Sequence, residues 1–127
     1  MSKIKREYKA VVKRVYDAKT IVLNIDLGFG MWMHHQKVKL YGTEDLPGTR
    51  GEDRKRGSYL KNILSDAILY REVTIVSLKE GNSYEVIMDL ELVEDGKIVK
   101  KSINTFIAGS YILSLDKKDK ELAFMED

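Results

Sequence analysis

The chain contains no cysteine. This absence excludes a disulfide framework, a thiolate metal site and a thiol nucleophile, and it leaves the redox compartment open. A large excess of one charge is also missing, because 22 basic side chains face 20 acidic ones and the formal net charge is +2. A dedicated non-specific DNA-binding protein has a stronger positive balance, so any binding of anions must depend on a local group of residues.

Long apolar runs are missing as well. Residues 1–9 are polar and basic, without the apolar segment of a signal peptide, and no run reaches the roughly 18 residues that span a bilayer. We therefore expect a soluble, cytoplasmic protein without a membrane partner. The composition leaves the oligomeric state open.

The chain has 127 residues, 43% of them hydrophobic, which is enough for one core and too few for two. We predict a single domain over residues 1–127, with its core at about 7–112 and a C-terminal tail at 113–127. The run DKKDK at 116–120 supports the tail, because a dense charge run is normally solvated.

The first half of the chain has the pattern of a β-meander. Residues 8–16 mix apolar and basic side chains, residues 21–26 alternate in a way that suits a half-buried strand, and residues 32–41 form a third candidate strand. Tight turns are predicted at 17–20 and at 27–30, where two glycines occur. The pattern predicts three consecutive antiparallel strands.

A helix is predicted over residues 51–70. Thr49 and Glu52 have the spacing of a capping box. An apolar stripe at helical intervals follows, made of Leu60, Ile63, Leu64, Ala67 and Ile68. We expect this helix to cover the open mouth of the sheet.

The second half returns to strands. Residues 71–79 and 84–94 are predicted strands, a hairpin turn leads to a short strand at 97–101, and residues 104–108 form a short helix before Gly109. The fold class is therefore mainly β (α+β). Five of these strands, with a helix after the third, predict a five-stranded OB-fold barrel with a capping helix, followed by a short C-terminal helix.

Two segments carry a resemblance to a known family: YKAVVKRVYDAKTIVLNID at 8–26 and VKLYGTEDLPGTRGEDRKRG at 38–57. They are similar to the staphylococcal nuclease (thermonuclease) family, which carries Asp-Gly-Asp-Thr after its first strand and ends its third strand with Arg-Leu before Asp-Thr-Pro-Glu. The resemblance extends over about residues 8–111 and is strongest in the first three strands. It implies an OB-fold and calcium-assisted phosphodiester hydrolysis.

The residues at the family's first motif differ here in charge. Asp17 and Thr20 match the first aspartate and the threonine, but the second aspartate falls on Lys19, so a cation stands where the family has a cation ligand. The strand arginine falls on Lys39, which keeps the charge but lacks the planar fork that grips phosphate. Asp17 and Thr20 also suit an ordinary turn.

The remaining catalytic groups of the family are absent. Without a gap, the second metal aspartate falls on Glu44, the threonine on Asp45 and the glutamate base on Pro47; with one inserted residue the aspartate pairs with Asp45 and the base falls on Gly48. Neither alignment keeps a base. The family's later arginine, expected near Tyr84, is also missing, because no arginine follows Arg71.

We therefore predict a catalytically inactive, nuclease-like domain that binds a phosphate-containing ligand at the former active site, without a cofactor. The ligand would be a nucleotide, such as a signalling nucleotide, or a short single-stranded nucleic acid. The predicted binding residues come from several parts of the chain: Lys19, Thr20, Lys39, Tyr41, Arg50 and Tyr84.

Two alternatives stay open at this point. In the first, the chain is a divergent calcium nuclease that uses the carboxylates of Glu44, Asp45, Glu52 and Asp53. Asp17, Glu44 and Asp45 are the weak metal candidates. In the second, the chain is a protein-interaction module without a ligand, which exposed apolar residues near Trp32 or Phe106 would favour.

Two further clusters carry expectations. His34 and His35 are adjacent in a predicted strand, where neighbours point to opposite faces, so the pair is not expected to chelate one ion. Trp32, Met31 and Met33 suit either partial burial or an interaction edge, and burial is favoured. The basic side chains at 50–56 are a candidate phosphate-binding cluster, since positive charge at a helix start is unfavourable without a partner.

Overall fold

The computed structural model describes residues 7–79 and 84–116. In this part of the chain the protein is mainly β, with helices after the third and the last strand, as predicted. The six strands are β1 (Glu7–Val15), β2 (Thr20–Gly28), β3 (Met31–Leu40), β4 (Glu72–Lys79), β5 (Tyr84–Glu94) and β6 (Lys97–Ser102). The helices are α1 (Arg54–Ile68) and α2 (Ile103–Ser114).

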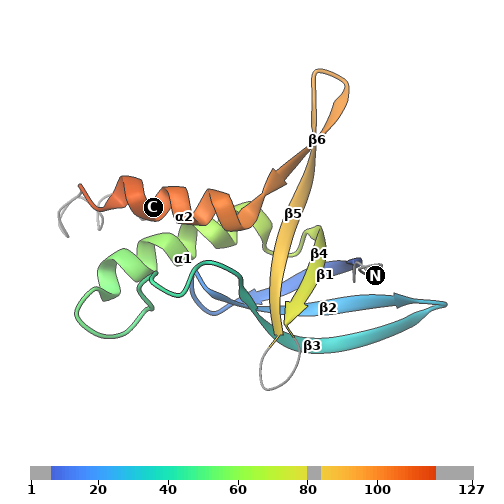
Figure 1. The fold of residues 1–127 in the computed structure, drawn as a ribbon, viewed down its shortest axis with the longest axis horizontal. Helices are drawn as coiled ribbons and strands as arrows, with labels where there is room; N and C mark the ends of the chain where they lie inside the picture. The colour runs from blue at the N-terminus through green and yellow to red at the C-terminus, as the bar shows by residue number, and fades with distance from the viewer. Residues whose placement is uncertain (1–6, 80–83, 117–127) are drawn as a thin grey trace, which may run out of the picture.

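The strands form one sheet whose first five members close into a ring. Their order is β3-β2-β1-β4-β5-β6, and an additional pairing between β3 and β5 closes the ring. The closing pairing is parallel and joins Val38 to Tyr84, Lys39 to Glu85 and Leu40 to Val86. The other strand pairs are antiparallel. β6 pairs only with β5, so the end of the β5–β6 hairpin projects away from the ring (Figure 1).

The core lies between the ring and the two helices, which pack against each other and against β1 and β5 (Figure 1). Alternation on the strands sends Ala10, Val12, Ile21 and Leu23 inward. The buried stripes of the helices supply Leu60, Leu64, Ile68, Ile103 and Ile107. The apolar periodicities of strand and helix therefore meet in one core.

The predicted start of the first helix is wrong. α1 begins at Arg54 rather than at 51, and its N-cap residue, Asp53, makes no side-chain capping bond. The backbone explains the failure of the capping box, because Gly51 has φ +95°, a left-handed conformation that interrupts a right-handed helix between Thr49 and Glu52. Thr49 and Glu52 are residue types that suit a capping box, but the backbone between them turns at Gly51.

The C-terminal helix is longer than the predicted 104–108. α2 starts at Ile103, where the Ser102 side chain accepts a hydrogen bond from the Thr105 N–H, and it continues through Gly109 to Ser114. A glycine costs a helix interior only about 1 kcal/mol, which the burial of Ile103 and Ile107 offsets. The predicted tail at 113–127 overlaps the end of α2, and its part from 117 onward lies outside the described residues.

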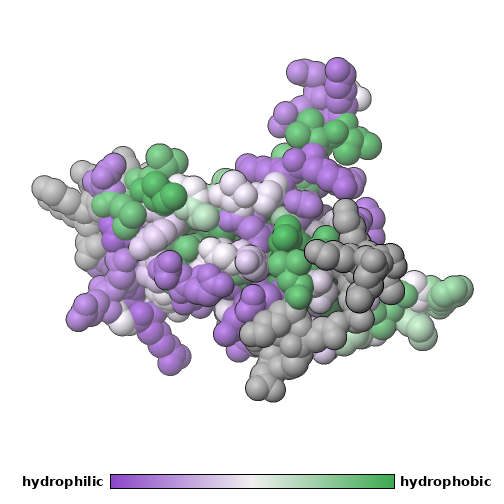
Figure 2. Space-filling model, viewed as in Figure 1, coloured by the Kyte–Doolittle hydropathy of each residue, from purple (hydrophilic) through white to green (hydrophobic). Residues whose placement is uncertain are grey.

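The β2–β3 hairpin extends beyond the ring and exposes apolar side chains at its end (Figures 1 and 2). Phe29 is 103% exposed and Trp32 43% exposed, so Trp32 is only partly buried. The tip has φ angles of +85° at Gly28, +54° at Phe29 and +76° at Gly30, and the Gly28 N–H donates to Asp26 Oδ1. These φ angles and this hydrogen bond shape the turn. Its apolar side chains are not covered by other described residues.

Candidate functional site

The predicted site is built around the turn between β1 and β2. Asp17 Oδ1 accepts hydrogen bonds from the backbone N–H groups of Lys19 (2.8 Å) and Thr20 (2.9 Å). The carboxylate of Asp17 is therefore engaged in shaping the turn. The Leu40 N–H donates to the Lys19 carbonyl (2.8 Å), which brings the turn beside the end of β3, where Lys39 pairs with Thr20.

Two cavities open on either side of this turn and share Asp17 and Thr20 as a common wall. We call them the Lys19 cavity, of about 270 Å³, and the Arg50 cavity, of about 370 Å³. The Lys19 cavity is lined by Asp17, Lys19, Thr20, Lys39, Leu40, Thr43, Glu44 and Glu85. The Arg50 cavity is lined by Tyr16, Asp17, Thr20, Lys37, Gly48, Thr49 and Arg50.

The Lys19 cavity carries charges of both signs. The predicted residues Lys19, Thr20 and Lys39 come together here, as expected for one site. However, Glu44 and Glu85 line the same cavity with Asp17, so three carboxylates face two ammonium groups. Glu85 was not anticipated, because it reaches Lys39 through the parallel β3–β5 pairing, and no local pattern in the sequence indicates that pairing.

The Arg50 cavity has a more positive lining, with Lys37 and Arg50 against Asp17. The Tyr16 ring at its edge contacts two cations: the Arg14 guanidinium carbon lies 4.5 Å and the Lys37 Nζ 4.9 Å from the ring centroid. Arg14 and Lys37 lie on either side of Val22 in the β1–β2–β3 register. Within residues 7–79 and 84–116, no carboxylate pairs with Arg14, Lys37 or Arg50.

These residues were missed by sequence reasoning, although a signal was present. Arg14 and Tyr16 are two apart in the strand predicted at 8–16, as are Lys37 and Lys39 in the strand predicted at 32–41, and residues two apart share a strand face. The sequence did not show that β1 and β3 lie on the two sides of β2 in a register that places these positions together. Only that register gathers the cations around Tyr16.

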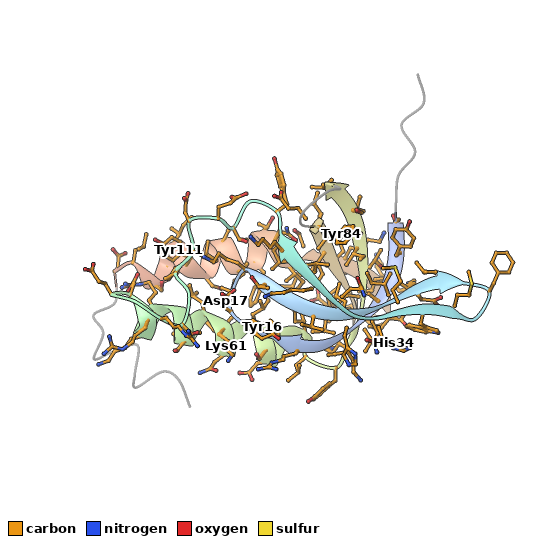
Figure 3. All side chains as sticks on the ribbon, turned by 90° about the horizontal axis from the view of Figure 1, so that it is seen from below. Tyr16, Asp17, His34, Lys61, Tyr84 and Tyr111 are labelled. Carbon is orange, nitrogen blue, oxygen red and sulfur yellow. The ribbon has the colours of Figure 1, made fainter. Side chains whose placement is uncertain are left out.

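The two predicted tyrosines lie elsewhere. Tyr41 is 49% exposed and lines none of the described cavities, while its backbone carbonyl accepts a hydrogen bond from Asn104 Nδ2 (2.8 Å). Tyr84 lines a third cavity at the open end of the ring, well away from Tyr16 and Asp17 (Figure 3). The predicted set is therefore divided among separate places: Lys19, Thr20 and Lys39 share the Lys19 cavity, and Thr20 and Arg50 share the Arg50 cavity.

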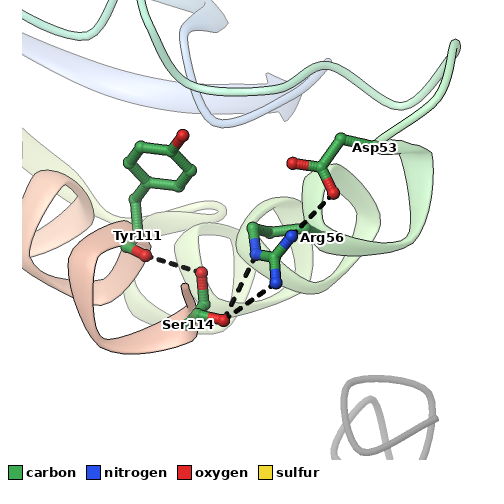
Figure 4. Close-up of polar contacts among 4 residues, drawn as sticks. All are labelled: Asp53, Arg56, Tyr111 and Ser114. Carbon is green, nitrogen blue, oxygen red and sulfur yellow. Dashed lines mark hydrogen bonds and ion pairs between the residues drawn. The ribbon is translucent and has the colours of Figure 1, made fainter. Parts of the chain in front are cut away.

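The basic stretch at 50–56 is also divided. Arg56 is only 12% exposed at its side chain, donates from Nη1 to Asp53 Oδ1 (2.8 Å), and donates from Nε and Nη2 to the Ser114 carbonyl (3.2 and 3.1 Å; Figure 4). The carbonyl lies at the end of α2, where a cation is favourable to the helix dipole. Arg56 therefore fastens α2 to α1, and its assignment to a phosphate-binding cluster is corrected.

The calcium site of the alternative reading does not fit this arrangement. Asp17 and Glu44 line the Lys19 cavity beside two ammonium groups, and Asp45 is absent from the lining of both cavities. In the part of the chain that the structure describes, no three His, Asp or Glu side chains are grouped so that they could hold a metal ion. A bound calcium ion would also lie beside the positive charge of Lys19.

The reason given against a histidine pair needs correction. Leu23 pairs with Gln36 and Ile25 with Met33, so His34 and His35 together face the single residue Asn24 in a β-bulge. His35 has φ +55°, its N–H donates to Asn24 Oδ1 (2.9 Å), and the two imidazole centroids are 6.4 Å apart. The strict alternation between strand faces is interrupted here.

Comparisons with known proteins add no identification. No protein-family model matches the chain, and no curated protein or solved structure matches it. The resemblance to the nuclease family thus stays a prediction. Neither described helix is both long and apolar enough to cross a membrane.

Proposed function

We propose that this domain is a non-catalytic, nuclease-like OB-fold that binds a nucleotide or a short single-stranded nucleic acid through its phosphates. The fold part of the proposal is supported by the closed ring of five strands and by the position of α1 between β3 and β4. A five-stranded barrel of this kind presents its outer strand face and adjoining loops to oligonucleotides.

One observation carries the binding proposal: Arg14 and Lys37 lie over the Tyr16 ring, and Arg50 lines the same cavity as Tyr16 and Lys37. None of these three cations has a carboxylate partner among the described residues. Like charges repel, so such a group is favourable when an anion neutralises it. The Arg50 cavity, of about 370 Å³, offers room for a phosphate between Lys37 and Arg50. The guanidinium plane of Arg50 provides two parallel donors, which match phosphate oxygens.

The charge balance of the two cavities moves the centre of the proposed site from the Lys19 cavity to the Arg50 cavity. The Lys19 cavity has a lining with one more carboxylate than ammonium group, which opposes an anion there. The Arg50 cavity has the opposite balance. Lys39 pairs with Thr20 in the shared wall, so the ligand can extend from Arg50 toward Lys39 along the outer face of β3.

Fluorescence anisotropy with a labelled oligothymidylate of about eight nucleotides, in chelator, tests this proposal. Lys37→Gln and Arg50→Gln should each weaken binding about fivefold and reduce the salt slope by about 0.7 per phosphate contact. Lys100→Gln, an exposed change on the projecting hairpin, is the matched control and should leave affinity unchanged. A mononucleotide competitor distinguishes a nucleotide site from an extended strand site. Equal effects of all three changes, or no binding, would contradict the proposal.

A separate experiment tests the proposal that the domain is not catalytic. Single-stranded DNA incubated with the protein and excess calcium should remain intact. In the proposed correspondence with the nuclease family, Lys19 takes the place of a metal aspartate and the base position falls on Pro47 or Gly48. Calcium-dependent cleavage that disappears in Asp45→Ala would establish the divergent nuclease instead.

A second candidate function, a protein-interaction module, is favoured by the end of the β2–β3 hairpin. Phe29, Met31 and Trp32 are exposed by 103%, 56% and 43%, and apolar side chains gather at this end of the hairpin (Figure 2). A partner would be captured by the intact chain and lost in Phe29→Ser, while the oligonucleotide affinity stays unchanged. Loss of both would show that the tip supports the fold rather than a partner.

A further inference from the structure

At the end of the ring where Tyr84 lies, a half-open cavity of about 330 Å³ enters between the strands. Each of the five ring strands contributes to its lining. Small barrels normally fill their interior with side chains, and protein interiors contain few voids larger than a water molecule. A hollow of this volume is therefore more than a packing defect.

The cavity has a buried, apolar floor and a more exposed rim. Val38, Ile75 and Val86 form the floor and are 2%, 1% and 1% exposed, whereas Leu27 and Tyr84 at the rim are 38% and 43% exposed. Ser77, which faces Val86 across the β4–β5 pair, is a small side chain among residues that line the interior. A larger residue there would fill the space.

The chemistry of the lining selects a class of ligand. In a chain in which 33% of residues are charged, none of the described side chains that line this cavity carries a charge. The polar groups are two tyrosines, Tyr8 and Tyr84, with Ser77 and Gln36. Gln36 Nε2 donates to the His34 carbonyl (2.9 Å), which orients the amide and leaves its oxygen as an acceptor.

We propose that this cavity binds a small, neutral, mainly apolar molecule with one hydrogen-bond donor. An apolar surface with a few placed polar groups is the usual composition of a small-molecule site. A cavity of about 150 Å³ holds one benzene ring, so this volume accepts a fused two-ring molecule. The site does not depend on the proposed phosphate site, since Val38 points inward between Lys37 and Lys39, which point outward.

Methyl NMR of the full chain, titrated with indole as the probe, tests the proposal. The methyl signals of Ile25, Met33, Val38, Ile75 and Val86 should shift and saturate with a Kd on the order of 1 mM, while those of Leu60 and Leu64 under the helices stay in place. Benzoate, a charged ring of similar size, should bind at least about tenfold more weakly.

Ser77→Phe should abolish the indole shifts by filling the cavity, and Val76→Phe, one position along β4 on the opposite face, is the matched control that should retain them. If Ser77→Phe fails to fold, Leu27→Trp at the rim should block entry in its place. The proposal is overturned if the methyl signals do not move, if benzoate binds as well as indole, or if a folded variant with a filled or blocked cavity binds indole normally.

Discussion

Arg50 and Arg56 come from the same basic stretch, yet the fold uses them in opposite ways. Arg56 is nearly buried and donates to Asp53 and to the Ser114 carbonyl, so it holds two helices together. Arg50 is exposed and lines a cavity with Lys37, without a carboxylate partner in the described chain. A cation engaged by the fold contributes stability, and a cation left unpaired on a hollow is available to a ligand.

A substitution at Gly57 should have the largest effect of all, on both stability and oligonucleotide binding. A Cβ on Gly57 would overlap the carbonyl of Gly48, in the segment that carries Arg50. Gly57→Ala should therefore lower the free energy of unfolding by about 3 kcal/mol, measured by urea denaturation, and also weaken oligonucleotide binding by displacing Arg50. Gly109→Ala is the control, because nothing lies within 4 Å of its added Cβ, and it should raise stability by about 0.5 to 1 kcal/mol. If both variants change the free energy of unfolding equally, the close contact between Gly57 and the Gly48 carbonyl is contradicted.

Separate substitutions of Arg56 and Arg50 by methionine test the difference between them next. Arg56→Met should cost about 2 kcal/mol, because the Ser114 carbonyl and Asp53 lose their donors, and should leave oligonucleotide affinity unchanged. Arg50→Met should change stability by less than about 0.5 kcal/mol and reduce affinity. Urea denaturation and anisotropy on both variants decide the matter, and a loss of affinity in Arg56→Met without a loss of stability would remove the distinction.

Tyr16 should have a smaller effect that is confined to binding. Tyr16→Leu removes the ring that contacts Arg14 and Lys37, so the cations lose their fixed positions and oligonucleotide affinity should fall about threefold. Tyr16→Phe keeps the ring and should bind like the parent chain. If the two variants weaken binding equally, the hydroxyl rather than the ring face is what matters.

The hairpin tip should show the smallest change in stability. Phe29 is fully exposed and has φ +54°, so Phe29→Asn loses no buried contact and places there a residue that tolerates the left-handed region. Thermal unfolding should show a free energy that is unchanged or higher by about 0.5 kcal/mol. A loss larger than about 1 kcal/mol would mean that the tip is packed against another part of the protein.

Some errors of prediction share one cause, a backbone feature that local pattern does not reveal. Thr49 and Glu52 have the residue types of a capping box, but the positive φ of Gly51 places them in a turn. His34 and His35 follow strand alternation in sequence, but a bulge opposite Asn24 interrupts it. In both places the tertiary structure accepts a local irregularity that the alternation or spacing of side chains cannot encode.

Periodicity in polarity was enough to predict the mainly β class, the order of strands and helices and most of the buried stripes, because it reflects which face of an element leaves water. Which charges meet could be read only from the folded chain. The parallel closure of β3 on β5 brought Glu85 beside Lys39, and the β1–β2–β3 register gathered Arg14 and Lys37 at Tyr16. Such contacts join residues far apart in the chain, so they follow from the packing of the whole ring rather than from any local pattern.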